Sequence, residues 1–169
     1  MAAVRTLRPL LLVDPIEIGG AGKVALESIR GLVGAGADVA VANFQYAGRP
    51  SGFDAAVRAA GATVLPLHQR TRLDWSCVPR LARWARGHGI DLVESHSFKA
   101  HVVAWRLRRA LGVPWLAYAH GWTAETWRVR LYNVLERRLL TRPDHVCAVA
   151  PPLADALREA GRDGPLSVI

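Results

Sequence analysis

Short apolar runs alternate along the chain with longer amphipathic stretches. The apolar runs have the length of strands and lie at residues 10–14, 38–42, 62–66, 91–95, 115–119, 144–149 and 166–169. The stretches between them have the length of helices and lie at about 21–33, 52–60, 78–88, 98–111, 124–140 and 153–160. This alternation is typical of a parallel sheet covered by helices. We therefore predict an α/β fold, a Rossmann-like doubly wound parallel sheet in three α/β/α layers.

Glycine and proline residues end several of the predicted elements. Gly34 and Gly36 follow the first helix, and Gly112 and Pro114 follow the fourth. No linker, repeat or low-complexity segment interrupts the alternation, so we predict a single domain over residues 1–169. The last apolar run begins a strand with no helix after it. We therefore expect the sequence to stop at a boundary between two domains.

The composition is that of an ordinary globular protein. Of the 169 residues, 51% are hydrophobic and 21% are charged, which excludes a disordered chain. No apolar run approaches the roughly 18 residues needed to cross a bilayer, and the run from Leu10 to Val13 is too short for a signal peptide. Cys77 and Cys147 are too few for a disulfide framework. We expect the reducing cytosol as the compartment.

The net charge of +8 comes mainly from arginine, which supplies 20 of the 22 basic residues. This charge is compatible with an anionic substrate, an anionic membrane surface or nucleic acid as the partner. The predicted helix 124–140 carries four of the arginines, namely Arg128, Arg130, Arg137 and Arg138. Because Trp127 lies near its start, the basic side is either a solvated face or a peripheral contact with an anionic membrane. Nucleic acid is the least favoured partner, since the chain has no recognised binding motif.

Three predicted strands are followed by residues suited to ligand binding. In an open parallel sheet, ligands bind outside the carboxyl ends of the strands. The turn Gly19-Gly20 lets backbone N–H groups approach a ligand, and the next helix offers its positive N-terminus to an anion. Lys23 adds charge in the first turn of that helix. We therefore predict a substrate-binding site formed by Gly19, Gly20, Lys23, His96, Ser97 and Gly121, with His120 beside it.

The histidines also have simpler interpretations. His120 can cap the next helix or bond a neighbouring loop, and His96 can bond a loop at the end of its strand. The histidine pair nearest to metal-ligand spacing is His96 and His101, which are five residues apart. We predict no metal and no bound cofactor.

Two nucleotide-binding motifs are matched only in part. Gly22-Lys23 is similar to a phosphate loop, but Val24 stands where that loop has Ser or Thr. The segment from Gly20 to Ala25 has the glycine spacing of a dinucleotide site. It begins well after Asp14, however, and the second predicted strand has no acidic ribose ligand after it. Both motifs are therefore rejected.

Taken in order, these landmarks resemble the N-terminal domain of the GT-B glycosyltransferases of family 4. The matching segments cover nearly the whole chain. They are Gly19-Gly20, the helix and strand from Ala21 to Val41, Asp91 to His96, Gly112 to Leu116 with His120-Gly121, Leu135 to Arg137, Asp144 to Val146, and Leu166 to Ile169. The family has a serine after the sixth strand, where this chain has Ala150.

The resemblance implies a retaining transfer of a sugar from a nucleotide diphosphate donor to an acceptor hydroxyl, without a metal. The acceptor would be a glycan, a glycolipid or a small molecule. In such enzymes the N-terminal domain mainly holds the acceptor, and the glycine turn lies near the acceptor and the donor phosphates. The histidine matching His120 contacts the donor sugar and is needed for activity. We therefore expect His120 to be the catalytic residue.

The resemblance also assigns the nucleotide site to a second, C-terminal domain, which this sequence does not include. We expect the chain alone to be inactive, because aligning the donor and stabilising the leaving diphosphate both need the second wall of the cleft. The enzyme is expected in the cytoplasm, with peripheral contact to the inner face of the membrane. The alternative is a stand-alone α/β binding or regulatory module that pairs with a separate catalytic chain.

Overall fold

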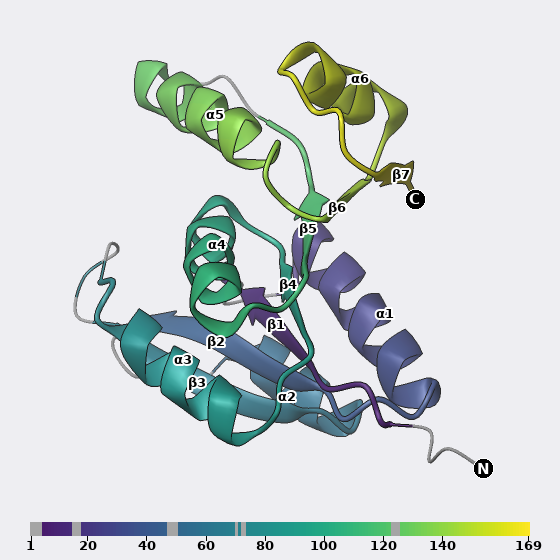
Figure 1. Cartoon of the computed structure of the whole chain (residues 1–169), viewed down its shortest axis with the longest axis vertical. Coiled ribbons are helices and arrows are strands. Elements are labelled where there is room, and N and C mark those ends of the chain that lie inside the picture. The colour runs from purple at the N-terminus through teal and green to yellow at the C-terminus, as the bar shows by residue number, and fades with distance from the viewer. Residues whose placement is uncertain (1–4, 15–17, 47–50, 70, 72–73, 123–125) are drawn as a thin grey trace.

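A parallel β-sheet runs through the centre of the molecule (Figure 1). The computed structural model describes residues 5–14, 18–46, 51–69, 71, 74–122 and 126–169, and seven strands from these ranges form the sheet in the order β3-β2-β1-β4-β5-β6-β7. They are β1 (Pro9–Val13), β2 (Ala40–Tyr46), β3 (Thr63–Gln69), β4 (Leu92–Ser95), β5 (Trp115–Ala119), β6 (His145–Ala148) and β7 (Leu166–Val168). The predicted Rossmann-like fold is confirmed.

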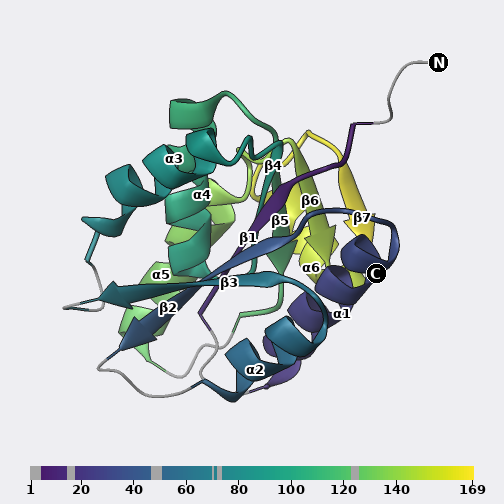
Figure 2. The ribbon, with the colours of Figure 1, turned by 90° about the horizontal axis from the view of Figure 1, so that it is seen from below.

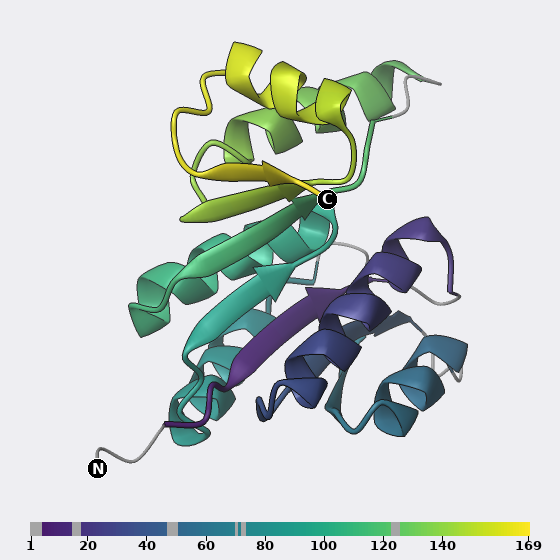
Figure 3. The ribbon, with the colours of Figure 1, turned by 90° about the vertical axis from the view of Figure 1, so that its right-hand side faces the viewer.

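Helices cover both faces of this sheet (Figure 2). Within the described ranges they are α1 (Gly20–Gly34), α2 (Gly52–Ala59), α3 (Cys77–Gly87), α4 (Phe98–Leu111), α5 (Trp127–Leu139) and α6 (Pro151–Glu159). α1 and α2 lie side by side on one face (Figure 3), and α3 and α4 pack on the other. The sheet therefore forms the middle of three layers.

The strand β1 is the centre of the core and is buried along its whole length. Its side chains alternate between two apolar clusters, because successive residues of a strand point to opposite faces. Leu11 and Val13 pack with residues of α1 and α2, such as Ile29. Leu10 and Leu12 pack with residues of α3 and α4. Burial on both faces explains why β1 reads as a continuous apolar run.

The strands β2 and β3 are longer than the sequence predicted. Their parallel pairing continues to Tyr46 opposite Gln69, beyond the end of β1. The prediction stopped β2 at Ala42, before the polar residues Asn43 and Gln45. Both side-chain amides donate hydrogen bonds to the carboxylate of Asp54 on α2, so these N–H donors of the strand have a partner within the domain.

The helix α5 is attached by polar contacts along its inner side. Nε1 of Trp122 donates to Oε2 of Glu136 at 2.9 Å, and Oε1 of Glu136 lies 3.4 Å from Nε2 of His101 on α4. The guanidinium of Arg137 lies over the ring of Trp122 at 4.5 Å. The predicted helix began at 124, but residues 124–125 lie outside the described part. In the structure Thr126 caps α5 by accepting from the backbone N–H of Val129.

Candidate functional site

The carboxyl ends of β1 and β4 border a pocket at the point where the strand order reverses. The chain moves outward from β1 through β2 to β3 and then returns to β4 on the other side of β1. Open α/β sheets bind ligands at such a switch point. The pocket has a volume of about 320 Å³. Its lining comes from the end of β1, the start of α1 and the end of β4, namely Val13, Asp14, Gly19, Gly20, Ala21, Gly22, Ala25, His96 and Ser97.

The glycines before and in the first turn of α1 leave the end of this helix open to the pocket. Gly19 has a φ of −81°, and a Cβ atom added to Gly19 or Gly20 would meet no atom within 4 Å. Neither the backbone at Gly19 nor the packing at either position therefore requires a glycine. The first N–H groups of a helix have no partner within it, and here no side chain of Gly19 or Gly20 separates them from a ligand. The positive end of the helix dipole favours an anion at this place.

His96 and His120 lie together at the ends of neighbouring strands. Nδ1 of His96 is 3.1 Å from Nε2 of His120. The other ring nitrogen of His96, Nε2, is 2.6 Å from Oε1 of Glu94, a carboxyl group that is 1% exposed. The hydrogen bonds from Glu94 to His96 and on to His120 therefore lead from a buried carboxyl group to the pocket, which His96 lines.

The alternation of side chains along β4 builds this network. Glu94 and His96 are two residues apart and share the face covered by α1, where the hydroxyl of Ser28 donates to Oε1 of Glu94 at 2.8 Å. Ser95 lies on the opposite face. Its hydroxyl is 2.8 Å from Nδ1 of His101 and accepts from Nε1 of Trp115 at 2.7 Å. One short strand thus supports a polar network on each face of the sheet.

The aromatic rings of His96, Tyr118 and His120 stack on the α1 face. The ring centroid of Tyr118 is 4.4 Å from that of His96 and 6.1 Å from that of His120. Burial, together with a smaller effect of the nearby carboxyl group of Glu94, raises the pKa of Tyr118 to about 12. Burial, together with a smaller effect of the histidines His96 and His101, lowers the pKa of His120 to about 4. At neutral pH the imidazole of His120 is therefore uncharged.

The structure brings most of the predicted site residues to one place. Gly19, Gly20, His96 and Ser97 line the pocket, and His120 joins them through its hydrogen bond to His96. Ser97 also caps α4, since its hydroxyl accepts from the backbone N–H of Ala100 at 3.3 Å.

Two predicted residues lie apart from the lining of the pocket. Gly121 is exposed and has a φ of 118°, a backbone conformation that residues other than glycine rarely adopt. Lys23 is exposed on α1. Neither residue borders the described pocket.

Glu94, Ser28 and Tyr118 belong to the network but were not identified from the sequence. The spacing of Glu94 and His96 was a usable signal, because two residues at i and i+2 of a strand share one face. Ser28 comes from α1, and Tyr118 comes from β5. Their approach to Glu94 and His96 depends on strand order, which no local pattern of residues contains.

No metal-binding group is formed by the described residues. No three His, Cys, Asp or Glu side chains among them are placed to hold an ion. His96 and His101 are the nearest candidates by spacing, but they lie on opposite faces of β4. His96 is hydrogen-bonded to Glu94, and His101 is hydrogen-bonded to Ser95. Both cysteines, Cys77 and Cys147, are free and buried.

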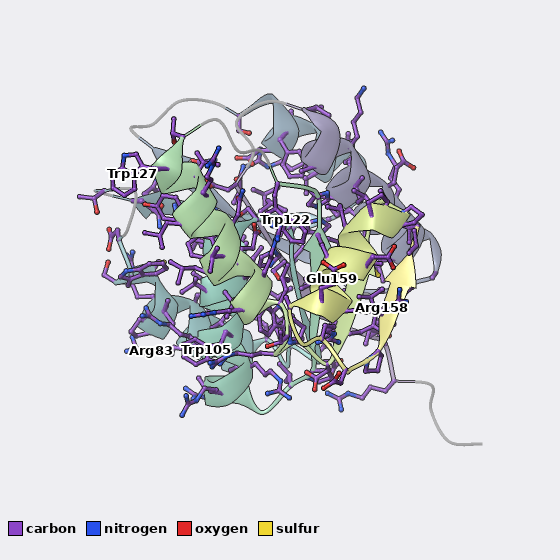
Figure 4. All side chains as sticks on the ribbon, turned by 90° about the horizontal axis from the view of Figure 1, so that it is seen from above. Arg83, Trp105, Trp122, Trp127, Arg158 and Glu159 are labelled. Carbon is purple, nitrogen blue, oxygen red and sulfur yellow. The ribbon has the colours of Figure 1, made fainter. Side chains whose placement is uncertain are left out.

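The outer side of α5 exposes apolar residues next to arginines. Trp127 is 70% exposed, Leu131 53% and Leu135 43%, and Figure 4 shows Trp127 at the outer edge of the molecule. Arg130 and Arg138 are exposed on the same helix. Arg137 instead lies inward over Trp122. In the described part of the chain, no helix has the length and apolar character needed to span a bilayer.

The comparisons with known proteins agree with this architecture. A family model described as Glycosyltransferase Family 4 matches residues 18–169. HepE of Anabaena in complex with UDP and glucose superposes with a TM-score of 0.75 at 17% identity, over 96% of this chain and 44% of that one. A glycosyltransferase from Rickettsia africae gives 0.72 at 13%, over 98% and 43%. The lipopolysaccharide outer core galactosyltransferase WaaB, in its apo form, gives 0.71 at 11%, over 96% and 45%.

The chain spans less than half the length of each of these solved structures. The TM-scores show that the fold is shared. At identities this low, the likeness says nothing about shared substrates. Among curated proteins, no sequence matches.

Proposed function

Because the chain belongs to Glycosyltransferase Family 4, we propose that it forms the acceptor-side half of an enzyme that moves a sugar from a nucleotide diphosphate donor to an acceptor hydroxyl. The observation that carries this proposal is the pocket at the switch point, where the N-terminus of α1 and His96 face the same space. Anabaena HepE, which shares the fold, binds UDP and glucose. A nucleotide sugar is therefore the donor that we propose for this protein.

The pocket suits the negatively charged part of such a donor. The open N–H groups at the start of α1 and the helix dipole stabilise phosphate oxygens. Ser97 offers its hydroxyl to a sugar or an acceptor on the opposite wall of the pocket, which the ring of His96 also lines. Because α1 offers its N–H groups without a side chain at Gly19 or Gly20, it can approach the ligand closely.

We place His120 against the donor sugar, as the catalytic residue. The low pKa of His120 keeps its ring uncharged at neutral pH. A neutral ring forms hydrogen bonds with a sugar hydroxyl without placing a positive charge beside the anomeric carbon, where positive charge develops as the diphosphate leaves. We propose that transfer retains the anomeric configuration and uses no metal.

Transfer in this proposal requires a second domain. The leaving diphosphate needs charge and N–H donors aimed at it from the facing wall, and donor and acceptor must be held in line by both walls. The 169-residue chain by itself supplies one wall. It is therefore expected to bind ligands weakly and to transfer no sugar at a useful rate.

A transfer assay with a panel of nucleotide sugars and hydroxyl acceptors tests this function. The complete gene product and the 169-residue chain are assayed side by side for release of nucleoside diphosphate that depends on the acceptor. We expect release by the complete protein and none by the chain alone. Turnover by the chain alone would contradict the half-enzyme proposal, and no turnover by the complete protein with any donor would favour a binding module.

We also propose that the outer side of α5 contacts an anionic lipid surface. A basic helix face with exposed Trp and Leu buries its apolar side chains at the headgroup boundary, while its arginines meet the lipid phosphates. On α5 the exposed apolar residues Trp127, Leu131 and Leu135 lie beside Arg130 and Arg138. The net charge of +8 supports the same partner. The enzyme would then work as a peripheral protein on the cytoplasmic face of a membrane.

A further inference from the structure

Glu94 is a buried acid that the proposed transfer does not use directly. It lies on β4 and is 1% exposed, below His96. It does not line the pocket. A buried carboxyl group is costly unless it is hydrogen-bonded, and Glu94 meets both Ser28 and His96 at the same oxygen, Oε1. Two hydrogen bonds to one oxygen fit an ionised carboxylate that accepts both.

The proton positions follow from this arrangement step by step. An ionised carboxylate has no proton to give, so Nε2 of His96 must donate to Oε1 of Glu94 across the 2.6 Å contact. When His96 is neutral, its Nδ1 carries a lone pair, and Nε2 of His120, 3.1 Å away, donates to it. In neutral His120 this leaves Nδ1 without a proton.

We propose that Glu94 is a positioning residue that acts on His120 through His96. It fixes His96 as the Nε2–H form, and His96 in turn fixes His120 as the Nε2–H form, with Nδ1 as a hydrogen-bond acceptor. The hydrogen bond of His120 among the described residues uses Nε2, and none of those residues is hydrogen-bonded to its Nδ1. The ligand that it takes is therefore a donor, and a sugar or acceptor hydroxyl has this chemistry.

This role rests on the proposed function for the identity of the hydroxyl, but the proton positions do not depend on it. A buried carboxylate that orients a histidine ring and sets its tautomer has a large effect on enzymes that use the ring. In this chain Glu94 sets the tautomer of His96, and His96 sets the tautomer of His120. The stacking of Tyr118 against His96 holds the first ring in plane while its hydrogen bonds set its orientation.

The direct test is a ¹⁵N spectrum of the histidine side chains of the protein at pH 8, where histidines are as a rule neutral. A ring nitrogen that carries a proton and one that does not resonate far apart, so each tautomer is read directly. In the wild-type protein we expect the Nε2–H form for both His96 and His120. A His120 ring with its proton on Nδ1 would overturn the proposal without any variant.

The variant Glu94→Gln removes the charge and lets the side-chain amide donate to His96. We expect both His96 and His120 to shift toward the form with a proton on Nδ1. The matched control is Glu136→Gln, which removes a carboxylate beside His101 on the opposite face and should leave both tautomers unchanged. Unchanged tautomers in Glu94→Gln would overturn the proposal. If Glu94→Gln does not fold, the wild-type spectrum alone decides.

The activity of the complete enzyme supplies a second readout. We expect Glu94→Gln to lower kcat by about 10- to 100-fold, with a smaller change in KM, and Glu136→Gln to stay within about twofold. If the spectra agree and no protein transfers sugar, the proposed function fails while the role of Glu94 in setting the tautomers stands. If the wild-type protein transfers sugar and Glu94→Gln has the same kcat, the positioning role fails by itself.

Discussion

His120 is held neutral by its surroundings, and this has a cost for stability at low pH. Burial and the neighbouring histidines lower its pKa to about 4 in the folded protein, whereas an unfolded histidine titrates near 6.5. Between these values the unfolded chain binds more protons than the folded one. The free energy of unfolding therefore falls as the pH falls through this window.

Replacing His120 by glutamine should weaken this pH dependence. Between pH 7 and pH 5, we expect the wild-type protein to lose roughly 2 kcal/mol more unfolding free energy than His120→Gln. Urea unfolding at the two pH values measures the loss in each protein. Groups that titrate equally in both proteins cancel in the comparison, so equal losses would show that His120 is not held neutral.

At the level of single residues, the sequence identified the right strand ends but not the contacts between them. Gly19, His96 and Ser97 were found because the carboxyl ends of parallel strands are where ligands bind. Glu94 was missed because it lies inside a predicted strand, where it looks like a solvent-facing polar position. Its burial depends on contacts with Ser28 of α1 and with His96, which the order of residues in the strand does not contain.

One carboxylate connects α5 both to α4 and to Trp122, which lies between β5 and α5. Oε2 of Glu136 accepts from Trp122, and its Oε1 faces the buried His101 of α4. We expect Glu136→Ala to lower the free energy of unfolding by about 1–3 kcal/mol, because Trp122 and His101 lose their polar partner. Chemical denaturation measures the difference.

The control for that variant is Glu159→Ala, at the exposed end of α6 (Figure 4). Its effect should stay within about 0.5 kcal/mol, as for an ordinary surface substitution. Equal effects of the two variants would show that Glu136 does not anchor α5.

The order and type of the elements could be predicted well, and their ends less so. Apolar periodicity located the core strands because β1, β4 and β5 are central and largely buried. It ended β2 too early, before Asn43 and Gln45, whose side-chain amides donate to Asp54 of α2. It also found the apolar stripe of α5 without showing that Trp127 and Leu131 are exposed.

The basic and apolar side of α5 predicts how the whole molecule meets a membrane. We expect the double variant Arg130→Gln/Arg138→Gln to bind vesicles containing phosphatidylglycerol about 10- to 30-fold more weakly than the wild-type protein, as two arginines near an anionic surface would contribute. Vesicle sedimentation at low salt measures this.

The matched control removes the same charge from exposed positions on α3, as Arg80→Gln/Arg83→Gln. Because those residues lie on another helix (Figure 4 labels Arg83), we expect less than about a threefold change. Equal weakening by both pairs would mean that binding follows net charge and not α5. Unchanged binding by Arg130→Gln/Arg138→Gln would contradict the proposed contact between α5 and the membrane.

In the proposed enzyme, this chain supplies one wall of the glycosyltransferase cleft and His120 acts at the donor sugar. The most direct test is the rate of sugar transfer by the complete protein as wild type, as His120→Ala, and as His88→Ala. His88 is an exposed histidine that ends α3 and hydrogen-bonds to Trp84, so it is a matched control. We predict that His120→Ala lowers kcat by about 100-fold or more, while His88→Ala stays within about twofold. A His120→Ala protein that transfers sugar at the wild-type rate would contradict this role of His120.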